Sequence, residues 1–159
     1  VLEVYSFVLR LGELNDINFN EKLKEKLNKS VNYLYQIQNE NNGHTPNYGS
    51  NDGSLLFPLS VCDYLNYNPQ LNLLYYILNK KKLYKPGKHE EELLWFYGKE
   101  IFNTDFDFIE KKSCAFSTGG YYVLRNKNSH AMIRCGDFQD RPSHSDVLHL
   151  DLWWKGNNC

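Results

Sequence analysis

The stretch GGYYVLRNKNSHAMIR, residues 119–134, decides the fold of the C-terminal part of the chain. Two runs, 119–125 and 130–134, carry the aromatic and aliphatic side chains that suit a pleated, half-buried surface. The four residues between them, Asn-Lys-Asn-Ser, are typical of a turn. The stretch therefore predicts a β-hairpin.

A further strand is predicted closer to the C-terminus. Leu148, Leu150 and Leu152 alternate there with other residues, which is the two-residue period of a half-buried strand. The change from a helical to a strand period falls near residue 112.

The first hundred residues have helical periodicity. Apolar residues on all sides of segment 2–11 predict a helix buried between others. Asn20 is placed to cap a second helix, in which leucines and valines recur every three or four residues up to position 34. Further helical segments are predicted over 55–64, from Asn68-Pro69 with Asn68 as the cap, and over 89–97.

This order predicts an α+β protein. Residues 1–112 form the helical part and residues 113–159 the antiparallel strands. Helices that precede the strands, rather than alternating with them, argue against a doubly wound parallel sheet.

Composition narrows the possible partners. The chain has 159 residues, of which 42% are hydrophobic, so it can form a core. A net charge of -1, from 18 basic and 19 acidic residues, gives no field that favours nucleic acid. No apolar run is long enough to span a membrane. The four scattered cysteines are predicted to be small buried residues. The chain begins with Val1 and ends at Cys159, which suggests a piece of a longer protein.

Two polar clusters could carry chemistry. The first, PNYGSNDGS at 46–54, lacks the GKS or GKT ending of a phosphate-binding loop, and is either a capped turn or a ligand-binding loop. The second, RPSHSD at 141–146, places His144 and Asp146 two residues apart on one face of an expected strand. They could be metal ligands, a catalytic pair or a structural pair. On a regular strand His149 would lie on the opposite face.

Other polar and aromatic residues have less specific patterns. Three of the four arginines, Arg125, Arg134 and Arg141, fall in one short stretch, which hints at anion recognition. The remaining histidines are predicted at the surface. The aromatic residues of the strands could stack on sugars, although core packing is favoured for most of them. The histidines are His44, His89 and His130, and the aromatic residues are Tyr121, Trp153 and Trp154.

Several stretches resemble one enzyme family. PNYGSNDGSLLFPL at 46–59, followed by Cys62-Asp63-Tyr64, resembles the loop-helix segment of heparinase II/III-like polysaccharide lyases. GGYYVLR, MIRCGDF and DRPSHSDVLHLDLWWKGNN resemble the first strands of the same family's β-domain, in the same order. The similarity covers most of the chain and is greatest to the alginate lyase-like branch.

The resemblance implies a fold and a reaction. The fold would be the C-terminal helices of an incomplete (α/α) toroid, followed by the first strands of an antiparallel β-sandwich. The reaction would be β-elimination on an acidic polysaccharide, in which a base removes the C5 proton of a uronic acid. This chain alone is expected to be an inactive fragment of such a lyase. The family also suggests a bacterial protein of the periplasm or cell envelope.

The resemblance also implies roles for individual residues. Tyr48 corresponds to the proton-transferring tyrosine, and His144 to a ligand of a structural zinc whose other ligands would lie outside this chain. Pro142 replaces a family histidine, and Arg141 could supply the missing positive charge. Asp146 would orient the strand junction. The substrate subsite would be shaped by Asn47, Asn51 and Asp52.

The sequence also allows two functions other than a lyase. Because Pro142 replaces the histidine, the protein could instead be a non-catalytic carbohydrate-binding protein on the same fold, for example in surface polysaccharide assembly. A zinc-dependent hydrolase would rest only on His144 and Asp146.

Overall fold

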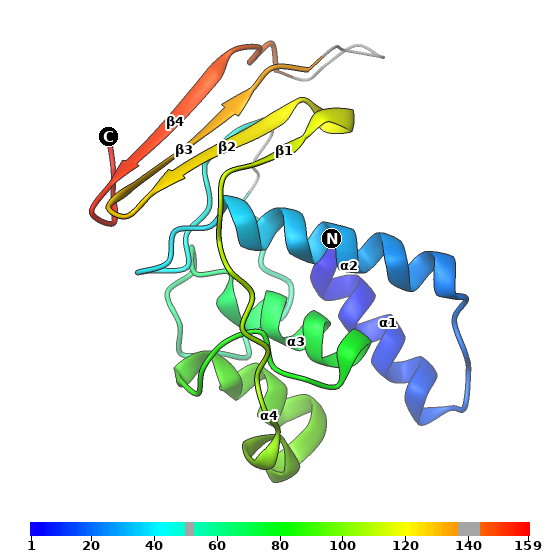
Figure 1. The fold of residues 1–159 in the computed structure, drawn as a ribbon. Coiled ribbons are helices and arrows are strands. Elements are labelled where there is room, and N and C mark those ends of the chain that lie inside the picture. The colour runs from blue at the N-terminus through cyan, green and yellow to red at the C-terminus, as the bar shows by residue number, and fades with distance from the viewer. Residues whose placement is uncertain (50–52, 137–143) are drawn as a thin grey trace. The chain divides into compact units, whose positions relative to one another are not determined.

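The protein has an α+β fold. The computed structural model describes residues 1–49, 53–136 and 144–159, and in these residues four α-helices precede an antiparallel sheet of five strands (Figure 1). The chain divides into two compact units. The first, the helical unit, comprises Val1–Leu34 and Leu55–Ile109. The second, the sheet unit, comprises Tyr35–Ser54 and Glu110–Cys159.

The helical unit is built around four helices. They are α1 (Leu2–Leu14), α2 (Glu21–Ile37, whose last turn belongs to the sheet unit), α3 (Asn68–Asn79) and α4 (Glu91–Tyr97). Short 3-10 turns at Lys88–Glu90 and Gly98–Asn103 flank α4. The unit's buried apolar core is formed by Leu9, Leu27, Val31, Leu71, Leu73, Leu74, Ile77, Leu83, Leu93 and Ile101.

Capping confirms one predicted helix start and corrects another. The Asn20 side chain accepts a hydrogen bond from the Leu23 amide at 2.8 Å, as expected of the N-cap of α2. In α3, however, Asn68 is already helical and Tyr67 is the N-cap, one residue earlier than predicted.

The helix predicted over 55–64 is wrong, because this segment is irregular. Pro58 interrupts it, and proline in a helix interior removes an amide donor and clashes with the preceding turn. Carboxylates of neighbouring helices instead bind its backbone. The Leu56 amide donates to Glu3 at 3.1 Å, and the Val61 amide donates to Glu91 at 2.6 Å.

The prediction that α1 is buried on all sides is also wrong. Its buried face carries Leu9 together with small or polar residues. Its other face is apolar and exposed among the described residues, and includes Val4, Val8 and Leu11.

A buried carboxylate makes the helical unit sensitive to pH. Glu92 on α4 is 1% exposed, and its Oε2 has no hydrogen-bond partner among the described residues. Burial, with a smaller contribution from the Glu3 carboxylate, raises the pKa of Glu92 to about 8. The folded protein therefore holds this proton more tightly than the unfolded chain does. The resulting stabilisation is complete below about pH 4.5 and is lost as pH rises through about 8.

Glu92→Gln is therefore expected to reduce the pH dependence of stability. Between pH 5.5 and 7 the wild type should lose about 2 kcal/mol of unfolding free energy through Glu92, and the variant should not. Urea unfolding at both pH values measures the difference. Glu100→Gln, at an exposed position in the 3-10 turn after α4, is the control. Equal slopes for wild type and Glu92→Gln would contradict the prediction.

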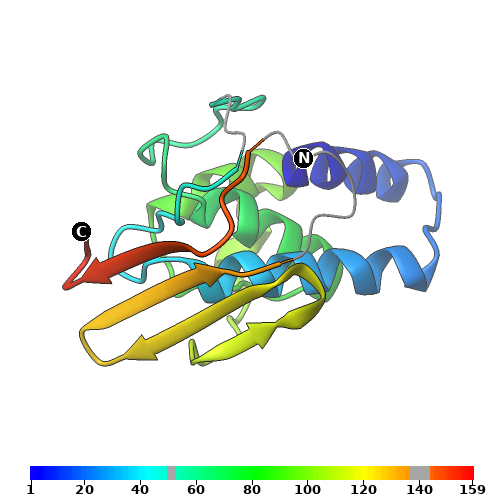
Figure 2. The ribbon, with the colours of Figure 1, turned by 90° about the horizontal axis from the view of Figure 1, so that it is seen from above.

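The sheet unit contains a meander of neighbouring strands, β1 to β5 in chain order (Figure 2). The strands are β1 (Cys114–Phe116), β2 (Tyr121–Asn126), β3 (Ser129–Arg134), β4 (His149–Trp154) and β5 (Asn157–Asn158). The predicted hairpin is confirmed as β2 and β3, with only Lys127 and Asn128 between them. β1 and β5 were not predicted, because two or three residues are too short for a periodic pattern.

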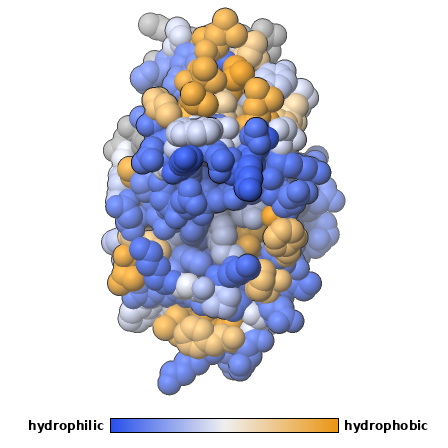
Figure 3. All heavy atoms as spheres, turned by 60° about the vertical axis from the view of Figure 1, so that its left-hand side comes forward, coloured by the Kyte–Doolittle hydropathy of each residue, from blue (hydrophilic) through white to orange (hydrophobic). Residues whose placement is uncertain are grey.

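The alternating leucines of β4 most simply suggest that the leucines face the core, but they lie on the exposed face of the sheet. Val123, Met132 and Asp151 lie side by side at the centre of the buried face. Leu150 and Leu152 lie on the opposite face and are 58% and 42% exposed. Apolar side chains accordingly gather at the surface near the top of Figure 3, where the sheet is drawn.

Two predictions about single residues need correction. The four cysteines are free, but none is fully buried, and Cys135 and Cys159 are exposed. His130 was expected at the surface and is 4% exposed, since it lies on the buried face of β3. Within the described residues, no helix has the length and hydrophobicity needed to cross a membrane.

Candidate functional site

The candidate site lies at one end of the buried face of the sheet. The register places Tyr121 of β2, Arg134 of β3 and His149 of β4 beside one another. Because alternate residues of a strand share a face, these three side chains leave the sheet on the same side.

Tyr48 reaches this row from the loop that follows α2. Its ring is half-buried and lies 5.3 Å from the ring of Tyr121, measured between centroids, with the planes tilted by 55°. The guanidinium carbon of Arg134 is 5.8 Å from the centre of the Tyr121 ring. Two phenols and one guanidinium are thus brought together from three segments of the chain.

Asp146 holds the loop and the strand together. One carboxylate oxygen accepts a hydrogen bond from the Gly49 amide at 2.9 Å, and the other accepts one from the Arg134 guanidinium. Gly49 has a φ of 67°, which favours glycine, and a methyl group added there would meet none of the described residues within 4 Å. The carboxylate therefore fixes the backbone next to Tyr48.

The electrostatics of the site follow from this clamp. Burial opposes the charge of Arg134, but the hydrogen bond to Asp146 and the charged forms of Tyr121 and Tyr48 outweigh it and raise the pKa of Arg134. Burial likewise opposes the charge of Asp146, while hydrogen bonds from Arg134 and Gly49 hold its pKa below the usual value. Arg134 is therefore a permanent cation beside two phenols.

The strand expected to carry His144 and Asp146 begins later than predicted. β4 starts at His149, and Leu148 has a φ of 61°, so the backbone turns there and the rule of alternating faces does not extend upstream. This turn is why Asp146 can bind Arg134, the strand partner of His149. The sequence leaves three roles open for Asp146: metal ligand, member of a catalytic pair, or structural partner. Its described contacts, with Arg134 and Gly49, are those of a structural partner.

The other predicted site residues fall into two groups. Asn47 and His144 are described and both are exposed. Arg141, Pro142, Asn51 and Asp52 lie outside the described residues.

The described residues do not by themselves form a complete zinc site. Across 1–49, 53–136 and 144–159, no three His, Cys, Asp or Glu side chains are grouped so that they could hold a metal ion. Asp146, the nearest acidic residue in sequence, is engaged by Arg134 and Gly49. His144 would therefore need ligands from outside the described residues, and zinc stays a prediction.

For two site residues the sequence offers only general hints, which are sugar stacking for Tyr121 and anion recognition for Arg134. The clustering of arginines was a signal for Arg134, and the hairpin register would have placed it opposite Tyr121. Nothing in the spacing of the chain indicated that Tyr48, more than 70 positions earlier, would meet them.

No protein-family model, curated protein or solved structure matches the chain.

Proposed function

We propose that this chain is part of a lyase that cleaves a uronic-acid-containing polysaccharide by β-elimination. The observation that carries the proposal is the placement of Tyr48 against Tyr121 and beside the clamped cation Arg134. The order of the sequence motifs, which resembles that of heparinase II/III-like lyases, supports the same proposal.

The chemistry requires a proton acceptor and a positive charge. Removal of the C5 proton leaves an electron pair that forms the C4–C5 double bond, while the C4–O bond breaks and the leaving oxygen takes up a proton. Negative charge develops beside the substrate carboxylate, so a cation that neutralises it lowers the barrier. Tyr48 would transfer the proton, and Arg134 would hold the substrate carboxylate.

The proposal extends to the surrounding fold. The helices would be the C-terminal helices of an (α/α) toroid, and the sheet would be the first layer of a β-sandwich. The exposed apolar faces of α1 and of the sheet support this, since a toroid and a sandwich would each supply a covering element. A structural zinc at His144 and a place in the bacterial periplasm or envelope belong to the same proposal.

The test is product formation by the protein that contains this chain. Unsaturated uronate products, followed by absorbance, should form from acidic oligosaccharides and not from neutral ones. Failure to form any such product would overturn the proposal. Binding of the same oligosaccharides without product would instead favour the non-catalytic carbohydrate-binding protein, which the Pro142 position suggests.

Arg134→Gln is expected to lower kcat/KM by about 10- to 100-fold, because a charge-assisted hydrogen bond contributes about 1.5–3 kcal/mol. Arg134→Lys should recover part of the loss, since it keeps the charge and loses only the planar fork. The thermal unfolding midpoint of each variant is measured in parallel. A glutamine variant as active as the wild type would exclude Arg134 from the reaction.

A further inference from the structure

A polar pocket lies at the other end of the same sheet face. Its volume is about 280 Å³, near the lower limit for small-molecule sites, so it fits one sugar residue rather than a chain of them. The floor is formed by Arg125, His130 and Trp153, which are neighbours in the register of β2, β3 and β4. Arg125 is four residues from Tyr121, which corresponds to about 13 Å along the strand.

The floor of the pocket is rigid. The Trp153 indole donates to the Asp151 carboxylate, and the His130 ring stacks on the indole at 5.6 Å with an interplanar angle of 12°. The Arg125 guanidinium donates to the carbonyl oxygens of Gln36 at 2.7 Å and Gln38 at 3.1 Å. These contacts fix the floor before any ligand binds.

The rim carries side chains that suit a charged and hydroxylated ligand. Lys127 comes from the hairpin turn and Lys155 from the turn after β4, and the Lys155 amide donates to the Asn128 carbonyl at 2.8 Å. Neither lysine forms an ion pair with a carboxylate in the part of the chain that the structure describes. Carboxamides complete the rim, from Asn39, Asn41, Asn126 and Asn128. In Figure 3 the side that carries the hairpin turn is brought forward and is mainly hydrophilic.

Positive charge exceeds negative charge around the pocket. Among the described residues that line it, Arg125, Lys127 and Lys155 are basic and Glu40 is the single acidic one. The Glu40 side chain is 59% exposed and lies 3.4 Å from Arg125. Burial first, and then the charge of Arg125, lowers the pKa of the neighbouring Lys111 to about 7. The same two causes, with Lys111 as a third, lower the pKa of His130 to about 4. An anion in the pocket would relieve this mutual repulsion.

We propose that this pocket binds one acidic sugar residue of a polysaccharide, as a subsite separate from the Tyr48 site. Lys127 and Lys155 would contact the acidic group, and the carboxamides would contact hydroxyls. The inference rests on the proposed function only for the identity of the acidic polymer. The pocket and the Tyr48 site lie at opposite ends of this face, with the buried residues Val123, Met132 and Asp151 between them.

Calorimetric titration of the Tyr48→Phe protein tests the proposal, since ligand binding is then measured without cleavage. The probes are tetramers of galacturonate and of mannuronate, a neutral tetramer of glucose, and inorganic phosphate. At least one acidic tetramer should bind. The double variant Lys127→Gln/Lys155→Gln should weaken that binding by about 10- to 100-fold. Salt should weaken binding to the unsubstituted pocket more than binding to this variant.

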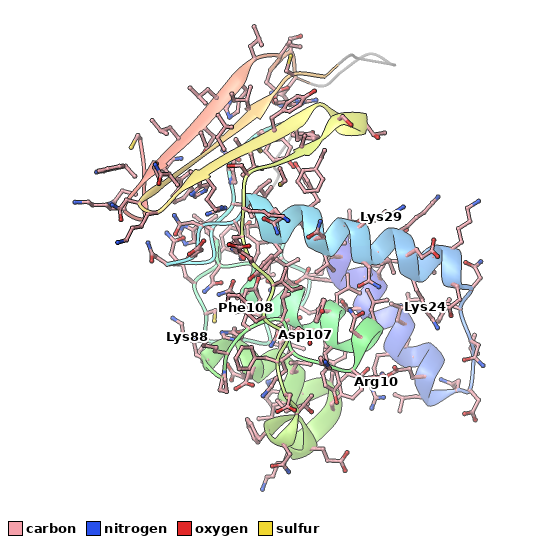
Figure 4. All side chains as sticks on the ribbon, viewed as in Figure 1. Arg10, Lys24, Lys29, Lys88, Asp107 and Phe108 are labelled. Atoms are coloured by element: carbon pink, nitrogen blue, oxygen red, sulfur yellow. The ribbon has the colours of Figure 1, made fainter. Side chains whose placement is uncertain are left out.

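The control is Lys29→Gln/Lys88→Gln, which removes the same charge from exposed positions of the helical unit labelled in Figure 4. It should leave the affinity unchanged. An equal loss in both double variants, equal binding of the neutral tetramer, equally tight binding of phosphate, or no binding of either acidic tetramer would overturn the proposal. Product formation by the wild type would still stand in each case, so failure of the subsite and failure of the lyase are distinguishable.

Discussion

Tyr48→Phe is expected to lower kcat for uronate elimination by about 10²- to 10⁴-fold, the usual contribution of a positioned proton-transfer group. The substitution removes only the hydroxyl, so the ring should keep its contact with Tyr121. Affinity for the substrate should change little, because Arg134 and the Asp146 clamp remain. Initial rates of unsaturated product formation, with KM measured separately, give the two effects.

Tyr121→Phe is the matched control for this prediction. It removes a hydroxyl from the ring packed against Tyr48, within the same electrostatic surroundings. Its loss of kcat should be much smaller. If the two variants were reversed in effect, Tyr121 would be the proton-transfer residue. If Tyr48→Phe turned over like the wild type, Tyr48 would have no part in the chemistry.

The elements predicted most accurately were those set by local signals. The second helix begins where the Asn20 side chain can cap it, and the hairpin forms where two strand-like runs flank a short polar turn. In both cases residues close in sequence decide the structure. The helix predicted over 55–64 does not form, because Pro58 interrupts helical hydrogen bonding even though its neighbours are hydrophobic.

Burial could not be predicted as well as secondary structure. Alternation along β4 showed that the two faces of the strand differ, but not which face is covered. The buried face proved to hold Asp151 and Trp153, because the indole and the carboxylate satisfy each other, while Leu150 and Leu152 lie outside. His130 is also buried and its ring stacks on Trp153, although its Nε2 has no hydrogen-bond partner among the described residues.

The candidate site was predictable only in part. The resemblance singled out Tyr48, and the arginine cluster pointed to a stretch that contains Arg134. Their meeting depends on Asp146, whose contact with Arg134 requires the turn at Leu148. A single residue with positive φ, which is uncommon for leucine, carries no reliable sequence signal. Long-range contacts of this kind are set by tertiary packing rather than by spacing.

The stability of the helical unit depends on a buried ion pair that the sequence did not reveal. The Lys82 Nζ lies 2.9 Å from Glu90 Oε1, as an ion pair without the alignment of a hydrogen bond, and the two side chains are 2% and 8% exposed. The Gly87 amide donates to the other Glu90 oxygen at 3.1 Å. The Lys82 backbone is fixed too, since its amide donates to the Asp105 carbonyl at 3.0 Å.

Lys82→Met is expected to destabilise the protein by about 3–5 kcal/mol, because it leaves the Glu90 carboxylate buried without its cation. Lys82→Met/Glu90→Gln should recover most of this loss, since no charge then remains buried. Lys81→Met is the neighbouring control, as the Lys81–Asp107 pair is 55% and 30% exposed and water screens it, so stability should change little. Urea unfolding measures all three. A single variant as stable as the wild type, or a double variant no more stable than the single one, would show that the charge of Glu90 is compensated without Lys82.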